Sequence, residues 1–219
     1  NVPQIVTALS GKEGLSVLDR EHFDLVLVSN NLPDVDTPEF GRRVKEAQPG
    51  LPVVMVVFDG SWFDQAYHGG EPEGIDWIFA WRGSANVLLS IMKLVEDSQN
   101  VDRDLSIASI GTILVVEDSV EHYSFILPHL YSLLMQRTFM LVPEGINESD
   151  RQVRTRVRPK VLLARTFGWA CQLFDKYETS LVGIISDLHT YHDDRIDPAT
   201  GIRFLRDAYQ ADGHSPNFR

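Results

Sequence analysis

Short runs of apolar residues alternate along the chain with segments whose apolar positions repeat every three or four residues. Six of these runs are bounded by polar or turn residues and have the length of strands rather than helices. They cover residues 24–28, 53–57, 75–79, 113–116, 161–164 and 181–185. Continuous apolar character of this kind is typical of strands that are buried on both faces of a parallel sheet.

The segments between these runs have the spacing of amphipathic helices. The predicted helices cover residues 12–20, 38–46, 85–96, 120–141, 166–177 and 201–209. Because strands and helices alternate, the sequence predicts an α/β fold with parallel sheets and right-handed crossovers. A further apolar run at residues 5–8 is expected to form a strand ahead of the others.

The polar stretch 96–104 separates the first three strands from the last three. We expect a first unit over residues 1–98, a linker over 99–110 and a second unit over 111–219, although a long loop would also fit. Near Val28 and again near Ile185, an apolar strand leads through a polar turn and an acidic segment into an amphipathic helix. This similarity predicts a duplication at the scale of a domain.

Composition narrows the class of protein further. The chain has 219 residues, of which 43% are hydrophobic, as expected for one or two globular domains. The single cysteine, Cys171, cannot form an internal disulfide and is interpreted as a position in a helix core, so a reducing, cytoplasmic compartment is expected. No apolar run is long enough to span a bilayer, so no membrane partner is expected.

The net charge of −11 argues against binding to nucleic acid, because phosphate contacts need clustered lysine and arginine. The segment 151–160 is the exception, with several basic residues close together. We interpret it as a solvated face of a helix or linker rather than a nucleic-acid patch.

Acidic residues follow two of the predicted strands of the second half. Glu117 and Asp118 come directly after 113–116, and Asp187 comes soon after 181–185. Ligands of open parallel sheets bind at the carboxyl ends of strands, and carboxylate oxygens are ligands that Mg²⁺ prefers. The pattern therefore predicts a Mg²⁺ site at which a carboxylate can also attack a phosphoryl group, with a capped turn as the alternative.

These segments resemble the receiver domains of bacterial response regulators. Residues 113–119 look like the first strand and acidic pair of a CheY-like receiver, and residues 183–187 look like the phosphoacceptor strand. The resemblance implies two flavodoxin-like units. It also implies a histidine kinase or phosphotransfer protein as partner and an output domain downstream.

The same resemblance implies the roles of particular residues in the second unit. Asp187 would accept a phosphoryl group, and Glu117, Asp118 and Asp187 would hold Mg²⁺. The backbone carbonyl of His189 would complete the protein ligands. The side chains of the polar loop that begins at His189 could also imitate a metal site, but a plain loop is the simpler interpretation.

The first unit resembles a receiver that has lost its acceptor. Residues 23–36 are similar to the phosphoacceptor segment, but Ser29 stands where the aspartate is expected. Val57 and Trp81 stand where receivers place a hydroxyl residue and a lysine. The resemblance therefore implies a pseudo-receiver that serves packing or partner contact.

Both units look incomplete, because the first begins at what resembles a second strand and the second ends before its last strands. Either the chain is a piece of a longer one, which we favour, or one half completes the other. The chain also resembles the N-terminal regulatory region of bacterial proteins similar to phosphoenolpyruvate synthase or pyruvate phosphate dikinase. The long helix at 120–141 has an apolar stripe that is typical of a core or of a homodimer face.

Three functions remain, in order of preference. The first is a phosphorelay module in which Asp187 is phosphorylated with Mg²⁺. The second is an interaction or dimerisation module that works without phosphorylation. The third is a Mg²⁺-dependent phosphohydrolase with Asp187 as nucleophile, although His189 stands where an acidic partner would be expected.

Overall fold

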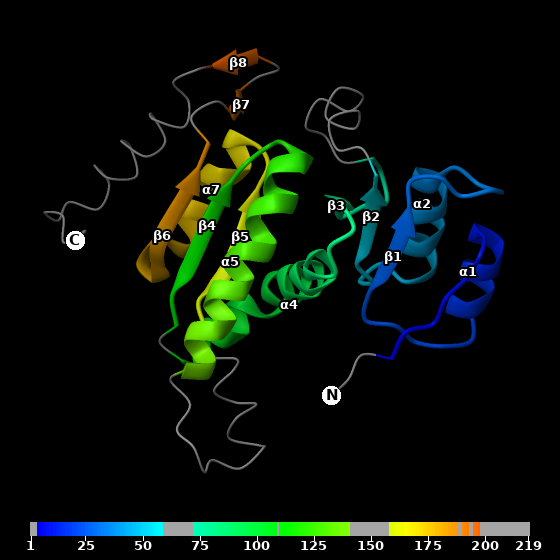
Figure 1. The fold of residues 1–219 in the computed structure, drawn as a ribbon, viewed down its shortest axis with the longest axis horizontal. Coiled ribbons are helices and arrows are strands. Elements are labelled where there is room, and N and C mark those ends of the chain that lie inside the picture. The colour runs from blue at the N-terminus through cyan, green and yellow to red at the C-terminus, as the bar shows by residue number, and fades with distance from the viewer. Residues whose placement is uncertain are drawn as a thin grey trace, which may run out of the picture.

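Two parallel, three-stranded sheets form the framework of the molecule (Figure 1). The structure is a computed structural model that describes residues 4–58, 72–108, 110–140 and 158–187, together with strands at 190–192 and 195–197. The first sheet has the order β1-β2-β3 and the second the order β5-β4-β6. The predicted α/β fold with flavodoxin-like units is confirmed.

The helices and strands agree closely with the expected ranges. The helices are α1 (Gly11–Leu18), α2 (Thr37–Ala47), α4 (Asn86–Ile107), α5 (Val120–Met140) and α7 (Phe167–Tyr177), with a short 3-10 helix η1 (Glu178–Ser180). The strands of the first sheet are β1 (Val26–Ser29), β2 (Val53–Val57) and β3 (Trp77–Ala80). Those of the second are β4 (Thr112–Val116), β5 (Lys160–Ala164) and β6 (Leu181–Ser186), and β7 (Thr190–His192) pairs antiparallel with β8 (Arg195–Asp197).

Strands β4 and β5 of the second sheet are buried on both faces, as the continuous apolar runs predicted, whereas Val182 and Ile185 of the edge strand β6 are exposed. Successive side chains of a strand point to opposite faces. Val161 and Leu163 of β5 accordingly enter the larger core cluster, whereas Leu162 and Ala164 enter a smaller one on the other face. Helix α7 covers that smaller cluster and places the partly buried Cys171 against it, in agreement with the predicted helix-core position.

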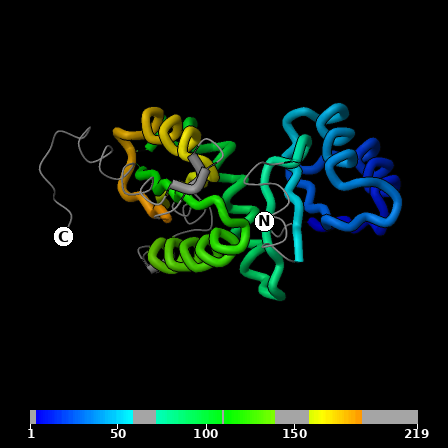
Figure 2. Tube along the Cα trace, turned by 90° about the horizontal axis from the view of Figure 1, so that it is seen from above, coloured from blue at the N-terminus to red at the C-terminus, as the bar shows by residue number. Residues whose placement is uncertain are grey.

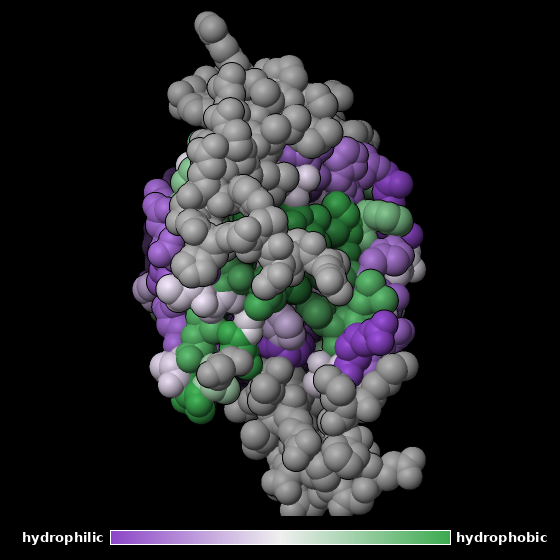
Figure 3. All heavy atoms as spheres, turned by 90° about the vertical axis from the view of Figure 1, so that its left-hand side faces the viewer, coloured by the Kyte–Doolittle hydropathy of each residue, from purple (hydrophilic) through white to green (hydrophobic). Residues whose placement is uncertain are grey.

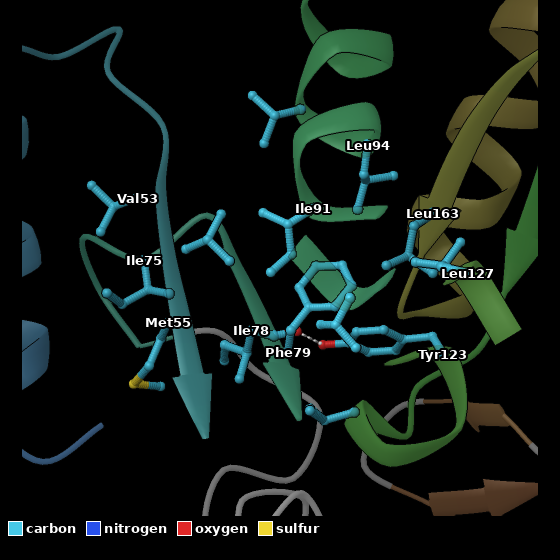
Figure 4. Packing of buried hydrophobic residues seen from close by; sticks show 14 of the residues in the cluster. Val53, Met55, Ile75, Ile78, Phe79, Ile91, Leu94, Tyr123, Leu127 and Leu163 are labelled. Carbon is cyan, nitrogen blue, oxygen red and sulfur yellow. Dashed lines mark hydrogen bonds between the residues drawn. The ribbon is translucent and has the colours of Figure 1, made fainter. Parts of the chain in front are cut away.

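One core cluster extends across both sheets. It joins Phe79 of β3 and Ile91 of α4 to Leu127 of α5 and Leu163 of β5, which Figure 4 shows in one apolar layer. Helix α4 lies between the two sheets in Figure 1, and Figure 2 shows the N-terminal and C-terminal elements on opposite sides of it. The two halves of the described chain are therefore packed together rather than merely linked.

Helix α5 also protects the outer edge of β3. Strand β3 pairs with β2 along one side, which leaves backbone groups on its other side to find partners. The Tyr123 hydroxyl donates to the carbonyl of Ile78, and the amide of Ala80 donates to Ser124 Oγ at 2.8 Å. Side chains of the second half thus replace a neighbouring strand for the first sheet.

Two sequence expectations are wrong. Residues 5–8 form no strand, and Ile5 is 79% exposed, because apolar residues make a strand only where a neighbouring edge is available. The expected polar joint at 96–104 and most of the linker at 99–110 are helical, since α4 continues to Ile107. The division into two domains near residue 98 stays a prediction, and the predicted helix at 201–209 lies outside the described residues.

The polar part of α4 is helical because its carboxylates face inward to buried cations. Asp97 is completely buried and accepts two hydrogen bonds from the Arg158 guanidinium, at 2.7 and 2.8 Å. It also accepts from the Tyr131 hydroxyl at 3.1 Å and from the Val161 amide at 2.9 Å. Lys160 Nζ lies 2.6 Å from the carboxylate of Asp104, which is about two helical turns beyond Asp97 on α4.

This network corrects the interpretation of the basic segment 151–160. Residues 151–157 lie outside the described residues, but Arg158 is 1% exposed and Lys160 is fully buried, so neither belongs to a solvated face. Burial alone would favour the neutral form of Arg158. The hydrogen bonds and charge of Asp97 outweigh it and raise the pKa of the guanidinium above its ordinary value.

None of the helices in the described part of the chain is both long and apolar enough to cross a membrane.

Replacing Arg158 by methionine is expected to lower the free energy of unfolding by roughly 3–5 kcal/mol, because Asp97 would lose its closest counter-charge in a buried site. Urea denaturation of wild type and variant measures the difference. The matched control is Arg137→Met on the exposed side of α5, which should change stability by less than about 0.5 kcal/mol. Equal effects of the two substitutions would contradict the role given to Asp97.

Candidate functional site

Glu117 and Asp187 are the first residues after two adjacent parallel strands. The backbone ladder continues one step beyond each strand: the Glu117 amide donates to the carbonyl of Ala164 at 3.0 Å, and the Asp187 amide donates to that of Val116 at 3.1 Å. These bonds hold both residues at the carboxyl end of the second sheet, which is the ligand-binding end of such sheets.

A pocket of about 260 Å³ opens between the ends of β4 and β6 and the first turns of α5. Its polar lining consists of Glu117, His122, Ser186 and Asp187, and apolar side chains of β4, α5 and β6 complete the walls. We call this feature the acidic pocket. The structure thus brings together Glu117 and Asp187, two of the three carboxylates that the sequence placed at one site.

Glu117 is a buried acid at the base of α5 whose pKa departs from its ordinary value. It is 5% exposed, and its Oε1 accepts from the Ser119 amide at 3.1 Å and lies 3.5 Å from His122 Nδ1. Burial raises the pKa of Glu117 to about 7, and the nearby charges of Asp187 and Asp118 add to the effect. The bond from Ser119 and the charge of His122 oppose the rise without cancelling it.

Asp118 lies beside the pocket rather than in its lining. Its carbonyl accepts a hydrogen bond at 3.2 Å from Nη2 of Arg165, a residue that follows β5 and is 1% exposed. Arg165 therefore places a buried positive charge next to the acidic turn that joins β4 to α5.

His189, whose carbonyl was expected to complete the ligands, lies outside the described residues. Among the residues that the structure does describe, no group of three acidic, histidine or cysteine side chains is close enough to hold a metal ion. A cation in the acidic pocket would therefore depend on water for several of its ligands.

Mg²⁺ fits this donor set on chemical grounds. It prefers oxygen ligands and usually keeps several waters, so one or two carboxylates are sufficient protein ligands. Burial is the main cause of the raised pKa of Glu117, and the charges of Asp187 and Asp118 add to it. A divalent cation beside these carboxylates would favour their ionised forms.

The corresponding end of the first sheet has a different chemistry. Ser29 ends β1, and its hydroxyl accepts from the Asn31 amide at 3.3 Å. Val57, which ends the adjacent strand β2, is fully buried, and its carbonyl accepts from the Trp81 amide at 2.7 Å. No carboxylate occupies these three strand-end positions.

Sequence reasoning missed two polar residues at the acidic pocket, His122 and Arg165. His122 lies in the first turn of α5, and its closeness to Glu117 along the chain could have indicated proximity. Arg165 lies 47 residues from Asp118, and only the pairing of β4 with β5 places them together.

The fold and the site define a class before any comparison: an α/β protein of flavodoxin-like units with an acidic pocket at the strand ends. A stretch of 57 residues, 26% of the chain, is 40% identical to the transcriptional regulatory protein GlrR of Escherichia coli (strain K12). The same figures hold for the transcriptional regulatory protein QseF of Escherichia coli O157:H7.

This similarity is local, since the chain spans 13% of the length of these two relatives. No family model matches the chain. The matched stretch supports a relationship to receiver domains.

Glu117→Gln is expected to stabilise the protein at pH 8 but not near pH 4.5. The pKa of Glu117 is about 7 in the folded state and 4.5 in the reference state. The folded state therefore keeps a proton that the unfolded state loses, and stability falls as pH rises between these values. The amide avoids this loss, so the gain at pH 8 should be roughly 3 kcal/mol.

Urea denaturation at both pH values, without added metal, measures this difference. Glu46→Gln, on the exposed side of α2, is the matched control and should behave like wild type. A Glu117→Gln gain that is as large at pH 4.5 as at pH 8 would show that charge is not the cause.

Proposed function

We propose that the chain is a regulatory phosphorelay module in which Asp187 accepts a phosphoryl group. The observation that carries this proposal is the meeting of Glu117 and Asp187 in one pocket at the ends of adjacent parallel strands. The local similarity to two transcriptional regulatory proteins supports a regulatory rather than an enzymatic role.

The reaction needs one nucleophile and a means of compensating charge. A carboxylate oxygen of Asp187 attacks phosphorus, the bond from phosphorus to the leaving group breaks, and the leaving group departs with the electron pair. The product is an acyl phosphate on Asp187. Mg²⁺, when bound, supplies positive charge to the phosphoryl oxygens.

Other residues at the site are proposed to hold the Mg²⁺ ion. Glu117 and Asp118 are the proposed protein ligands of Mg²⁺ together with Asp187, and the carbonyl of His189 is the expected further ligand. Because Glu117 is buried and held by the Ser119 amide, its carboxylate needs little rearrangement on binding.

The first unit has a supporting role in this proposal. Ser29 has no carboxylate to form an acyl phosphate, and the neighbouring strand ends present Val57 and Trp81. The unit over residues 1–98 is therefore a pseudo-receiver that packs against the second. A histidine kinase or phosphotransfer protein is the proposed phosphoryl donor in the cytoplasm, and an output domain is the proposed recipient of the signal.

A second candidate function is an interaction or dimerisation module that needs no phosphorylation. Phe125 and Leu133 of α5 are 67% and 59% exposed, although both are large and apolar. Exposed apolar side chains on a long helix favour contact with another protein surface. A concentration-dependent mass that Asp187→Asn leaves unchanged would favour this function.

Incubation with acetyl phosphate and Mg²⁺ is expected to add one phosphoryl group to the wild-type chain, as measured by intact mass. Asp187→Asn should abolish the adduct because an amide cannot form an acyl phosphate. Asp175→Asn, at an exposed position of α7, is the matched control and should be labelled like wild type. Ser29→Ala should also be labelled normally.

The outcomes separate the proposed functions. An adduct that persists in Asp187→Asn, or the absence of any adduct while a known receiver is labelled in parallel, refutes the phosphorelay function. Rapid multiple turnover of small phosphate esters would instead indicate the phosphohydrolase.

A further inference from the structure

Arg165 connects the acidic pocket with the side chain of Tyr123. Its Nη2 donates to the carbonyl of Asp118, which lies in the turn between Glu117 and α5. Its guanidinium carbon lies 5.5 Å from the centre of the Tyr123 ring, within the range of a cation–π contact. Because Arg165 is 1% exposed, both contacts are made in a site from which water is largely excluded.

Tyr123 in turn contacts the edge strand of the first sheet. It is fully buried, and its hydroxyl donates to the carbonyl of Ile78, as the dashed line in Figure 4 marks. Its ring meets the ring of Phe79 edge to face, at 5.5 Å and 83°. The next residue of α5, Ser124, accepts from the Ala80 amide at 2.8 Å.

These contacts form a continuous path from one half of the chain to the other. It runs from the acidic turn through Arg165 and Tyr123 to β3, and the side chains of Arg165 and Tyr123 are both buried. Close-packed interiors transmit displacements, because a side chain that moves must displace its neighbours. Electrostatic repulsion also acts along the path, because a cation in the pocket would repel the guanidinium of Arg165.

We propose that Arg165 and Tyr123 couple occupancy of the acidic pocket to the edge strand β3 of the first sheet. The inference rests on the proposed function only in requiring that the pocket bind a divalent cation. When positive charge enters beside Glu117, the attraction between the acidic turn and Arg165 weakens. The guanidinium and the ring of Tyr123 then shift together, and the hydrogen bond to Ile78 changes length.

The coupling gives the first unit a part in signalling although it has no acceptor carboxylate. Linkage is reciprocal, so a partner that binds the first unit and displaces β3 would alter the affinity of the pocket for its cation by the same factor. The first unit would then respond to cation binding in the second unit, or change the cation affinity of its pocket, through β3.

The test is titration of the 219-residue chain with Mg²⁺ while backbone amide resonances are recorded. In wild type, the amides of Ser119 at the pocket and of Phe79 and Ala80 in β3 should shift with the same dependence on Mg²⁺. In Tyr123→Phe, which removes one hydroxyl, the Ser119 shift should remain and the β3 shifts should be lost. Arg165→Met should give the same result from the other end of the path.

Tyr177→Phe is the matched control, because its hydroxyl also donates to a partner, Asp102, at 2.7 Å, but on the side of α4 away from β3. It should keep the full response. If Tyr123→Phe does not fold, Arg165→Met decides the test by itself, because it removes the guanidinium at the other end of the same path.

The results distinguish this inference from the proposed function. Binding of Mg²⁺ that shifts Ser119 but leaves β3 unchanged in wild type overturns the coupling alone. A β3 response that persists in both Tyr123→Phe and Arg165→Met also overturns it. The absence of any Mg²⁺-dependent shift overturns both proposals.

Discussion

The hydrogen bonds of the buried Asp97 carboxylate are the interaction on which the placement of α4 against α5 and β5 depends. A charge in a dry interior is tolerated only when its lone pairs are satisfied, and Asp97 receives hydrogen bonds from Arg158, Tyr131 and the Val161 amide. These partners come from the start of β5 and from α5, so a single side chain of α4 sets the position of both elements. Lys160 and Asp104 extend the same network.

The acidic pocket follows from the sheet that this network positions. Once β5 is aligned on α4, its register with β4 places Ala164 opposite Val116, and the next residues, Arg165 and Glu117, lie side by side at the strand ends. Strand β6 brings Asp187 to the same edge on the other side. The site therefore combines the carboxylates of Glu117 and Asp187 with the nearby buried guanidinium of Arg165, although no sequence motif contains all three residues.

The two halves depend on each other at the edge of β3. In an isolated three-stranded sheet the outer backbone groups of β3 would need water or another strand, whereas here Tyr123 and Ser124 satisfy two of them. The larger core cluster crosses the same boundary. This contact gives a physical reason for keeping the first sheet, because its removal would expose Tyr123 and the apolar face of α5.

The sequence by itself determined the α/β class, the six strands of the two parallel sheets and the acids at the strand ends, because buried strands require continuous apolar runs; it did not predict β7 and β8. It could not show that the polar stretch 96–104 is helical or that Arg158 and Lys160 are buried. Their partners lie on α4, and Asp97, the partner of Arg158, is 61 residues away from it in the sequence. The edge contacts of Tyr123 and the charge of Arg165 beside the pocket were likewise decided by tertiary structure. A buried polar residue is indistinguishable in sequence from a solvated one until the fold supplies its partner.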